Sequence, residues 1–158
     1  MIVLGIDPGT ASMGYGVLKL TEERAILKGH GVVRTHPDQE MHKRLGVLYS
    51  NLNDVAAQYK PEIVVIEKLF FNTNAKTAIT VGQARGIAML VAAHNGAGVE
   101  EYTALQAKKY LAGYGRADKV EMQDAVKKIL GMSQIIKPDD ANDGVAMALC
   151  YYKLSFLK

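Results

Sequence analysis

MIVLGIDPGTASMGYGVLKL, residues 1–20, is the part of this chain that most clearly indicates its fold class. The apolar run at residues 2–6 is typical of a buried strand, and residues 14–20 form a second strand-like run. A proline and a glycine between the two runs favour a tight turn. This pattern predicts a β-hairpin whose first strand leads directly into the carboxylate of Asp7.

The rest of the chain predicts one more strand and then an alternation of helices and strands. The expected elements are a strand at residues 25–35, a helix from residue 41 that ends before Pro61, a strand at 63–66, a helix at 77–94, a strand at 99–102, and helices at 103–113, 118–131 and 138–154. A hairpin pairs antiparallel strands, whereas a helix between two strands makes them parallel neighbours. We therefore expect an α/β fold in a single domain over residues 1–158, with a mixed five-stranded sheet and helices on both of its faces.

The predicted helix at residues 77–94 is apolar on most of its sides. Gly82 and Gly86 lie four residues apart in it, so they share one face and would allow a neighbour to approach closely. This pattern predicts a largely buried helix that lies between the sheet and a partner subunit.

The composition is that of an ordinary globular protein, because 49% of the 158 residues are hydrophobic and 22% are charged. No run approaches the ~18 apolar residues that a membrane-spanning helix requires, so no membrane association is expected. Cys150 is the only cysteine, which excludes an internal disulfide and favours a reducing compartment. The sequence therefore predicts a cytoplasmic protein.

Positive charge is concentrated in residues 103–137, although the whole chain carries a formal net charge of only +3. This segment contains seven basic and three acidic residues, which gives it a net charge of +4. A polyanion such as nucleic acid would be attracted mainly to this segment. The alternative interpretation is that these charges only solvate ordinary helix faces.

Four carboxylates stand where a metal site could form. Asp7 and Glu67 each follow an apolar strand, and α/β proteins place their ligand sites at the carboxyl ends of strands. Asp140 and Asp143 are three residues apart, so they share one face of the last predicted helix with apolar residues. Converging carboxylates repel one another unless a proton or a cation lies between them. Oxygen ligands without clustered histidine or cysteine favour Mg²⁺ or Mn²⁺ over zinc.

Two glycines of the second strand lie close to Asp7 in the predicted hairpin. Gly14 and Gly16 have no side chains, and we expect this to leave room for a phosphate backbone alongside Asp7. The alternative interpretation is purely conformational, because turns commonly use aspartate, proline and glycine.

Five motifs, in their order and spacing, resemble those of the RuvC family of Holliday junction resolvases. They are GIDPGTASMGYGV (residues 5–17), VIEKLFF (65–71), GQARG (82–86), RADKVEMQ (116–123) and PDDANDGVAMA (138–148). The resemblance extends over nearly the whole chain. It implies a ribonuclease H-like fold and a structure-selective endonuclease that resolves four-way DNA junctions in homologous recombination and DNA repair.

By this resemblance, the metal-binding and catalytic acids of the family fall on Asp7, Glu67, Asp140 and Asp143. The resemblance implies two Mg²⁺ ions at these acids when substrate is bound, with Mn²⁺ as the alternative. One ion would activate water and the other would stabilise the departing 3′-oxygen. The products would carry 5′-phosphate and 3′-hydroxyl ends.

The same resemblance implies contacts with DNA outside the four acids. Phe70 matches an aromatic residue that inserts against unstacked bases near the junction centre, the alternative being an ordinary core phenylalanine. Lys108 and Lys119 match basic positions near the DNA backbone, and we expect Arg116 to contact the DNA as well. Two opposed strands of the junction must be cut, so a C2 homodimer is expected. The family further implies cooperation with the RuvA and RuvB branch-migration proteins.

Three other interpretations are compatible with parts of the sequence. The IDPGT motif, residues 6–10, also resembles the phosphate loop of actin-like and Hsp70-like ATPases, but those proteins close two such domains over ATP and this chain predicts one. A non-catalytic junction-binding module is opposed by the four intact acids. Another nuclease of the same fold, such as a YqgF-type protein, is disfavoured by the segment around Phe70 and by the basic RADK segment.

Overall fold

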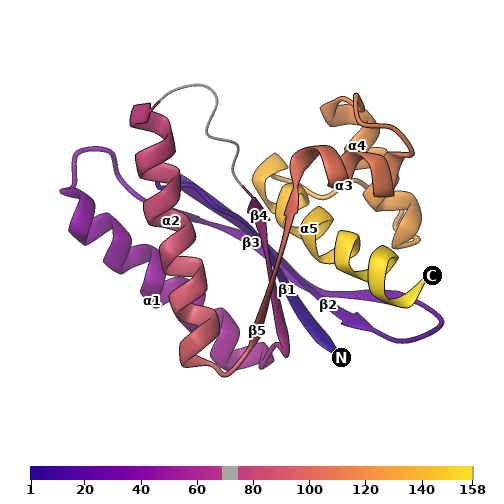
Figure 1. Ribbon diagram of the computed structural model, residues 1–158, viewed down its shortest axis with the longest axis horizontal. Helices are drawn as coiled ribbons and strands as arrows, with labels where there is room; N and C mark the ends of the chain where they lie inside the picture. Colours follow the sequence, from indigo (N-terminus) through magenta and orange to yellow (C-terminus); the bar gives the residue numbers. More distant parts are fainter. Residues whose placement is uncertain (69–74, 158) are drawn as a thin grey trace.

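A computed structural model describes residues 1–68 and 75–157 and contains, within them, a sheet of five strands between two groups of helices (Figure 1). The strands are β1 (Ile2–Asp7), β2 (Ser12–Leu20), β3 (Ala25–Arg34), β4 (Ile63–Lys68) and β5 (Gly98–Thr103). The helices are α1 (Met41–Tyr59), α2 (Ala75–His94), α3 (Ala104–Ala112), α4 (Lys119–Ile129) and α5 (Asp139–Phe156). Every element expected from the sequence is present, close to its expected bounds.

The strands lie in the order β3-β2-β1-β4-β5. β2 is antiparallel to both β1 and β3, whereas β1 pairs with β4 and β4 with β5 in parallel. The sheet is mixed, as predicted, because hairpins join the first three strands and helices join the later ones. In the register of β1 and β4, Ile6 lies opposite Ile66. The next residues, Asp7 and Glu67, therefore lie side by side at one edge of the sheet.

The alternation of side chains along β1 and β4 places both acids on the same face of the sheet. Ile6 packs into the core on the α1 and α2 face, whereas Val3 packs into the core on the α5 face. Successive strand residues point to opposite faces, so Asp7 falls on the α5 face. Val65 also belongs to the α5 core, which places Glu67 on that face as well.

Local signals begin and end the helices around the basic segment. The side chain of Thr103 accepts a hydrogen bond from the Gln106 amide, and the Gln106 side chain accepts one from the Thr103 amide. This is the capping box that the sequence predicts. Gly113 ends α3 with a φ of 92°, and Asp118 caps α4 by accepting from the Glu121 amide. Short-range chemistry therefore sets these helix ends.

Helix α2 is buried along only one side in the single chain. Its buried residues are Ala84, Ala88, Val91 and Ala92. The opposite side is exposed and carries Ile79, Gly82, Gly86, Met89 and Leu90. In the single chain α2 lies in an outer layer and is covered along one side only, so the expected burial against a partner subunit stays a prediction (Figure 1). Neither α2 nor any other helix among the described residues is long and apolar enough to cross a membrane.

Two glycines allow α5 to lie directly on β2. A Cβ atom at Gly14 would overlap the backbone carbonyl of Asp140, and one at Gly16 would overlap the side chain of Val145. The expectation that these glycines leave room for a phosphate backbone is therefore wrong, since α5 fills that space. Their effect is to bring the first turn of α5, with Asp140 and Asp143, down onto the sheet beside Asp7.

Candidate active site

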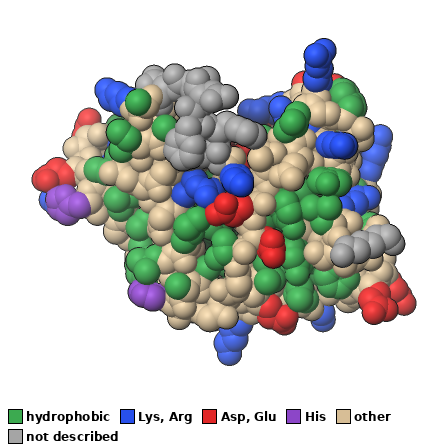
Figure 2. Space-filling model, viewed as in Figure 1, with side chains coloured by type: hydrophobic (Ala, Val, Ile, Leu, Met, Phe, Trp, Pro, Cys, Tyr) green, Lys and Arg blue, Asp and Glu red, His purple; other side chains and the backbone are tan. Residues whose placement is uncertain are grey.

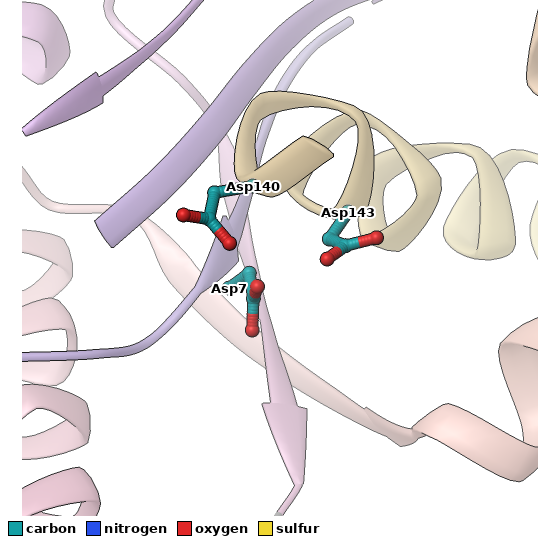
Figure 3. A group of neighbouring side chains, drawn as sticks. All are labelled: Asp7, Asp140 and Asp143. Carbon is teal, nitrogen blue, oxygen red and sulfur yellow. The ribbon is translucent and has the colours of Figure 1, made fainter. Parts of the chain in front are cut away.

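Three aspartates of the predicted site converge at one edge of the sheet (Figure 3). Asp7 is the last residue of β1, and Asp140 and Asp143 lie in the first turns of α5. Carboxylate oxygens of the three residues, one from each, lie within 4.8 Å of one another. Glu67, near the end of β4, is linked to Asp7 by a side-chain hydrogen bond. The structure therefore brings the four predicted acids together, although only the three aspartates form the tight group.

The acids of this cluster resist simultaneous ionisation. Burial raises the pKa of Asp7 to about 9, with further contributions from the hydrogen bond and charge of Glu67 and from the charges of Asp143 and Asp140. Burial likewise raises the pKa of Asp143 to about 6, and the charges of Glu67 and Asp140 add to this shift. A cation would relieve the repulsion that a proton otherwise relieves. This half-buried, oxygen-only donor set fits a divalent metal ion.

Ser12 orients one of the three aspartates. Its Oγ atom donates a hydrogen bond of 2.6 Å to Oδ2 of Asp140. Ser12 opens β2, and Gly14 on the same strand admits the backbone of Asp140, so β2 positions both the main chain and the carboxylate of this acid. Ser12 was not predicted as a site residue, because its partner lies 128 residues away and no local pattern links the two.

Arg85 of α2 holds the strand end that carries Glu67. Its guanidinium donates to the backbone carbonyl of Glu67 and, at 2.8 Å, to Oε1 of Glu101 on β5. The side chain of Arg85 is only 13% exposed, so both contacts are shielded from water. A planar guanidinium that bridges two acceptors restrains both of them. The GQARG motif contains Arg85, but no sequence pattern predicted this contact.

The two predicted DNA-contacting lysines lie beside the acids. Lys108 and Lys119 line a cavity of about 240 Å³ together with Glu67 and Asp143. The ammonium group of Lys119 also donates to Oδ2 of Asp139 at 2.8 Å. On the face shown in Figure 2, lysine and arginine side chains gather over α3 and α4, in the upper right of the view. The uneven charge along the sequence therefore corresponds to a basic surface next to the acidic cluster.

The other two residues predicted to contact DNA are placed differently. Arg116 is exposed between α3 and α4 and, among the described residues, is not part of the cavity wall. Phe70 lies outside the described residues, so its contact with unstacked bases stays a prediction.

We expect the melting temperature of the metal-free protein to fall as the pH rises from about 5 to about 9. In the folded protein Asp7 keeps its proton up to a pKa of about 9, whereas in the unfolded chain it loses the proton near the ordinary value of 3.8. The stability that this group contributes is therefore complete below pH 3.8 and is lost as the pH rises through about 9, because the folded state binds more protons in that window.

Mg²⁺ should raise the melting temperature most near pH 9. There Asp7 has lost its proton, and the cation compensates the charge of the carboxylate instead. Thermal scans against pH, with and without Mg²⁺, measure both effects. The Asp7→Asn variant serves as the control, because it should lose most of the pH dependence in this window. A melting temperature of the metal-free protein that is flat or rises over the same range would contradict the expectation.

Comparison with known proteins finds relatives over nearly the whole chain. The family profile described as "Crossover junction endodeoxyribonuclease RuvC" matches residues 3–151. A protein of that description from Rubrobacter xylanophilus is 47% identical over 150 residues, which cover 95% of this chain and 84% of the relative. One from Desulforamulus reducens is 46% identical over 155 residues, which cover 98% of this chain and 95% of the relative. The solved structure of Thermus thermophilus RuvC in complex with a Holliday junction substrate matches with a TM-score of 0.93 at 33% identity, covering 99% of this chain and 96% of that one.

The mixed sheet, the helices on both of its faces and the acids gathered at its edge define a nuclease of the ribonuclease H-like class. This confirms the fold class that the sequence predicts. Within that class, the chain belongs to the RuvC family of crossover junction endodeoxyribonucleases. Membership of this family sets aside the ATPase and the YqgF-type interpretations.

Proposed function

We propose that this protein is a structure-selective endonuclease that resolves four-way (Holliday) DNA junctions during homologous recombination and DNA repair. The observation that carries the proposal is the convergence of Asp7, Asp140 and Asp143, with oxygens within 4.8 Å of one another, in a chain of the RuvC family. The solved complex of Thermus thermophilus RuvC with a junction substrate supports the same choice of DNA. Residues 1–158 act as one nuclease domain of this kind.

Asp7, Glu67, Asp140 and Asp143 are the metal-binding and catalytic residues in this proposal, and they hold two Mg²⁺ ions when DNA is bound, with Mn²⁺ as a substitute. When bound, such ions supply an activated water and charge compensation at the departing 3′-oxygen. The raised pKa of Asp7 supports this assignment, because a proton now relieves a repulsion that a cation would relieve better. The hydrogen bond from Ser12 keeps the carboxylate of Asp140 aimed into the cluster.

The proposal assigns the DNA backbone to basic residues next to the acids. Lys108 and Lys119 contact phosphates near the cut, since both line the cavity that Glu67 and Asp143 also line. Arg116 adds an exposed positive charge to the same surface. Phe70 inserts against unstacked bases at the junction centre, an assignment that rests on its place in the VIEKLFF motif.

The decisive experiment is incubation of a mobile four-way DNA junction with the pure protein and Mg²⁺. We expect paired nicks at symmetric positions in two opposed strands, with 5′-phosphate and 3′-hydroxyl ends that a ligase can rejoin. Denaturing gels with end-labelled strands map the cuts, and ligase treatment reports the chemistry of the ends. A linear duplex of the same sequence is the control substrate and should stay intact. Binding of the junction without any cutting would instead support the non-catalytic interpretation.

The protein acts as a homodimer in this proposal, because two opposed strands need two active sites related by twofold symmetry. The exposed side of α2 is suited to the interface. Ile79, Leu90 and Met89 are 64%, 44% and 36% exposed on it, and no charged residue separates them on this side. Gly82 and Gly86 on the same side have no atom within 4 Å of an added Cβ, so a second chain can approach the helix backbone. An exposed apolar surface of this kind commonly marks an association site.

Gly86→Arg should weaken self-association by roughly 100-fold or more, because it places an unpaired charge in the middle of the proposed interface. The folded monomer should tolerate the change, since nothing lies within 4 Å of a Cβ at Gly86. Gly46→Arg, at another exposed helical glycine with nothing within 4 Å, is the matched control and should leave association unchanged. Sedimentation velocity over a range of concentrations measures the effect. A Gly86→Arg variant that stays as dimeric as the control would argue against this face.

The proposal also covers the location of the protein in the cell and its protein partners. The single cysteine of the chain favours a reducing compartment, and the proposal therefore places the protein in the cytoplasm. Branch migration moves the four-way junction that this protein would cut. RuvA and RuvB, the branch-migration proteins expected from the family resemblance, are therefore its partners at the junction. A pull-down of purified RuvA and RuvB on a junction that carries this protein tests the association.

A further inference from the structure

Arg85 approaches Glu67 from the face of the sheet that the acids do not occupy. The side chain of Glu67 lies on the α5 face, where it shares a cavity wall with Asp143. Arg85 belongs to α2, which covers the opposite face together with α1. In the register of β4 and β5, Glu101 lies opposite Ile66, a residue of the core on the α2 face. The side chain of Glu101 is therefore on the same face as Arg85.

Two hydrogen bonds join Arg85 to neighbouring strand ends. Its guanidinium donates from Nη1 to the backbone carbonyl of Glu67 and, at 2.8 Å, from Nη2 to Oε1 of Glu101. The side chains of Arg85 and Glu101 are 13% and 27% exposed, so water competes little for either contact. Two bonds from one planar group restrain both direction and distance. Glu101 therefore fixes the guanidinium, and the guanidinium fixes the carbonyl.

The carbonyl of Glu67 limits where the carboxylate of the same residue can lie. A peptide group is planar, so holding this oxygen also holds the plane that joins Glu67 to Lys68. The pairing of β4 with β1 ends at Ile66, one residue earlier, so Arg85 supplies a restraint that β1 no longer gives. The rotamers open to a side chain depend on the backbone that carries it. The contact from Arg85 therefore restricts the directions in which the carboxylate of Glu67 can point.

Glu67 is the acid whose place at the metal depends most on such a restraint. It is not part of the tight group of three aspartates, and a hydrogen bond links it to Asp7. Metal ligands must be held within about 0.5 Å of their productive positions. We infer that Arg85 is a positioning residue that aims Glu67 at the metal through the backbone, so that metal affinity and the rate of cutting depend on its two hydrogen bonds. This inference rests on the proposed nuclease function and adds a residue outside the four acids to it.

Arg85→Lys tests the inference while the positive charge is kept. Lysine can still pair with Glu101, so no carboxylate is left unpaired and the variant should fold. Its ammonium group does not match two acceptors as a planar guanidinium does, so the hold on the Glu67 carbonyl is lost. We expect the affinity for Mn²⁺ to fall by roughly 10- to 100-fold, the usual effect of removing a contact that orients a metal ligand. Titration of the DNA-free protein, with electron paramagnetic resonance of the free Mn²⁺, measures this without any cutting.

The rate of cutting should change, whereas binding of the junction should not. In single-turnover reactions with saturating junction, Arg85→Lys should cut roughly 10- to 100-fold more slowly, and a higher Mn²⁺ concentration should restore part of the rate. The dissociation constant for the junction in EDTA should stay within about a factor of two of the wild-type value, because exposed cations supply most of the affinity and Arg85 is mostly buried. Sedimentation velocity should show unchanged self-association, which separates this effect from the neighbouring Gly86 on the proposed dimer face.

Val91→Ala is the control that separates positioning from general stability. Val91 is a fully buried residue of the same helix and packs in the core on the α1 and α2 face. Removing its methyl groups leaves a small cavity and should lower the melting temperature. The Mn²⁺ affinity and the rate of cutting should stay within about a factor of two of the wild type, because distant sites act independently. If Arg85→Lys and Val91→Ala lose melting temperature and cutting in the same proportion, Arg85 only stabilises the fold and the inference is overturned.

A second variant covers the case in which lysine still reaches both acceptors. Arg85→Met with Glu101→Met removes the two charges together, so neither is left unpaired, and methionine cannot donate to the Glu67 carbonyl. It should lose at least as much Mn²⁺ affinity as Arg85→Lys. Wild-type Mn²⁺ affinity in this double variant would remove the positioning role and leave the nuclease function standing. A wild-type protein that binds Mn²⁺ more tightly than both variants, yet cuts no junction, would remove the nuclease function and leave the positioning role standing.

Discussion

Asp7→Asn will bind a four-way junction almost as well as the wild type, but its rate of cutting will be lower by a factor of about a thousand or more. Loss of a ligand that holds a catalytic cation removes several kcal/mol of transition-state stabilisation, and about 4 kcal/mol corresponds to three powers of ten in rate. Asp7 lies close to all three of the other acids, since Glu67, Asp143 and Asp140 all raise its pKa. An amide at this position keeps the size of the side chain and removes its charge.

The same substitution should stabilise the metal-free protein. The amide cannot ionise, so the burial cost and the repulsion that together raise the pKa of Asp7 to about 9 disappear. Loss of cutting together with a higher melting temperature would show that the carboxylate of Asp7 is needed for catalysis and destabilises the metal-free fold. Asp54→Asn, at an exposed acid of α1, is the control and should change neither quantity. Cleavage by Asp7→Asn at a rate comparable to the wild type would refute the assigned metal site.

Gly14→Ala will lower both the free energy of unfolding and the rate of cutting, and this is the second large effect that we expect. A methyl group at this position overlaps the backbone carbonyl of Asp140, and backbone atoms cannot rotate away as a side chain can. We expect a loss of roughly 1–3 kcal/mol in the free energy of unfolding, the usual cost of overpacking. The first turn of α5 must move away from β2, which lengthens the contact between Ser12 and Asp140 and opens the cluster. Cleavage should fall with it.

Gly46→Ala is the matched control for this prediction. Gly46 lies in α1 with no atom within 4 Å of an added Cβ, so alanine should stabilise the helix by about 0.5–1 kcal/mol. Urea denaturation of both variants gives the free energies, and thermal scans with Mg²⁺ report whether the cluster still responds to a cation. If both glycine variants shift stability in the same direction, close packing of α5 on β2 is not the reason for Gly14.

Much of the fold could be predicted because its signals are local. The apolar runs around Asp7 and Glu67, the capping pair Thr103 and Gln106, and the stop at Gly113 act over a few residues each. A helix between two strands then restricts how the strands can pair. The four acids were assigned to the site for a different reason, because their motifs keep the order and spacing of the RuvC family, and their roles stay a prediction.

Two other features could not be read from the sequence for a common reason, which is that burial and contact depend on which surfaces meet. Gly14 and Gly16 were expected to make room for DNA, and in the folded chain α5 occupies that room. Helix α2 was expected to lie between the sheet and a partner subunit, and the single chain covers only one of these two sides. In both cases the residue types indicated close packing, but the sequence did not identify the element that packs against them.

Residue order alone specified the secondary structure, the strand ends that carry Asp7 and Glu67, and the acidic residue types suited to a hard cation. Only the tertiary structure created the hydrogen bond from Ser12 to Asp140, the hydrogen bond from Arg85 to the end of β4, and the cavity beside Lys119. Hydrogen bonds, desolvation and repulsion between charges act over a few ångströms of space regardless of sequence separation. Residues 128 positions apart can therefore share one site, and only the packing of α5 against the sheet brings them within range.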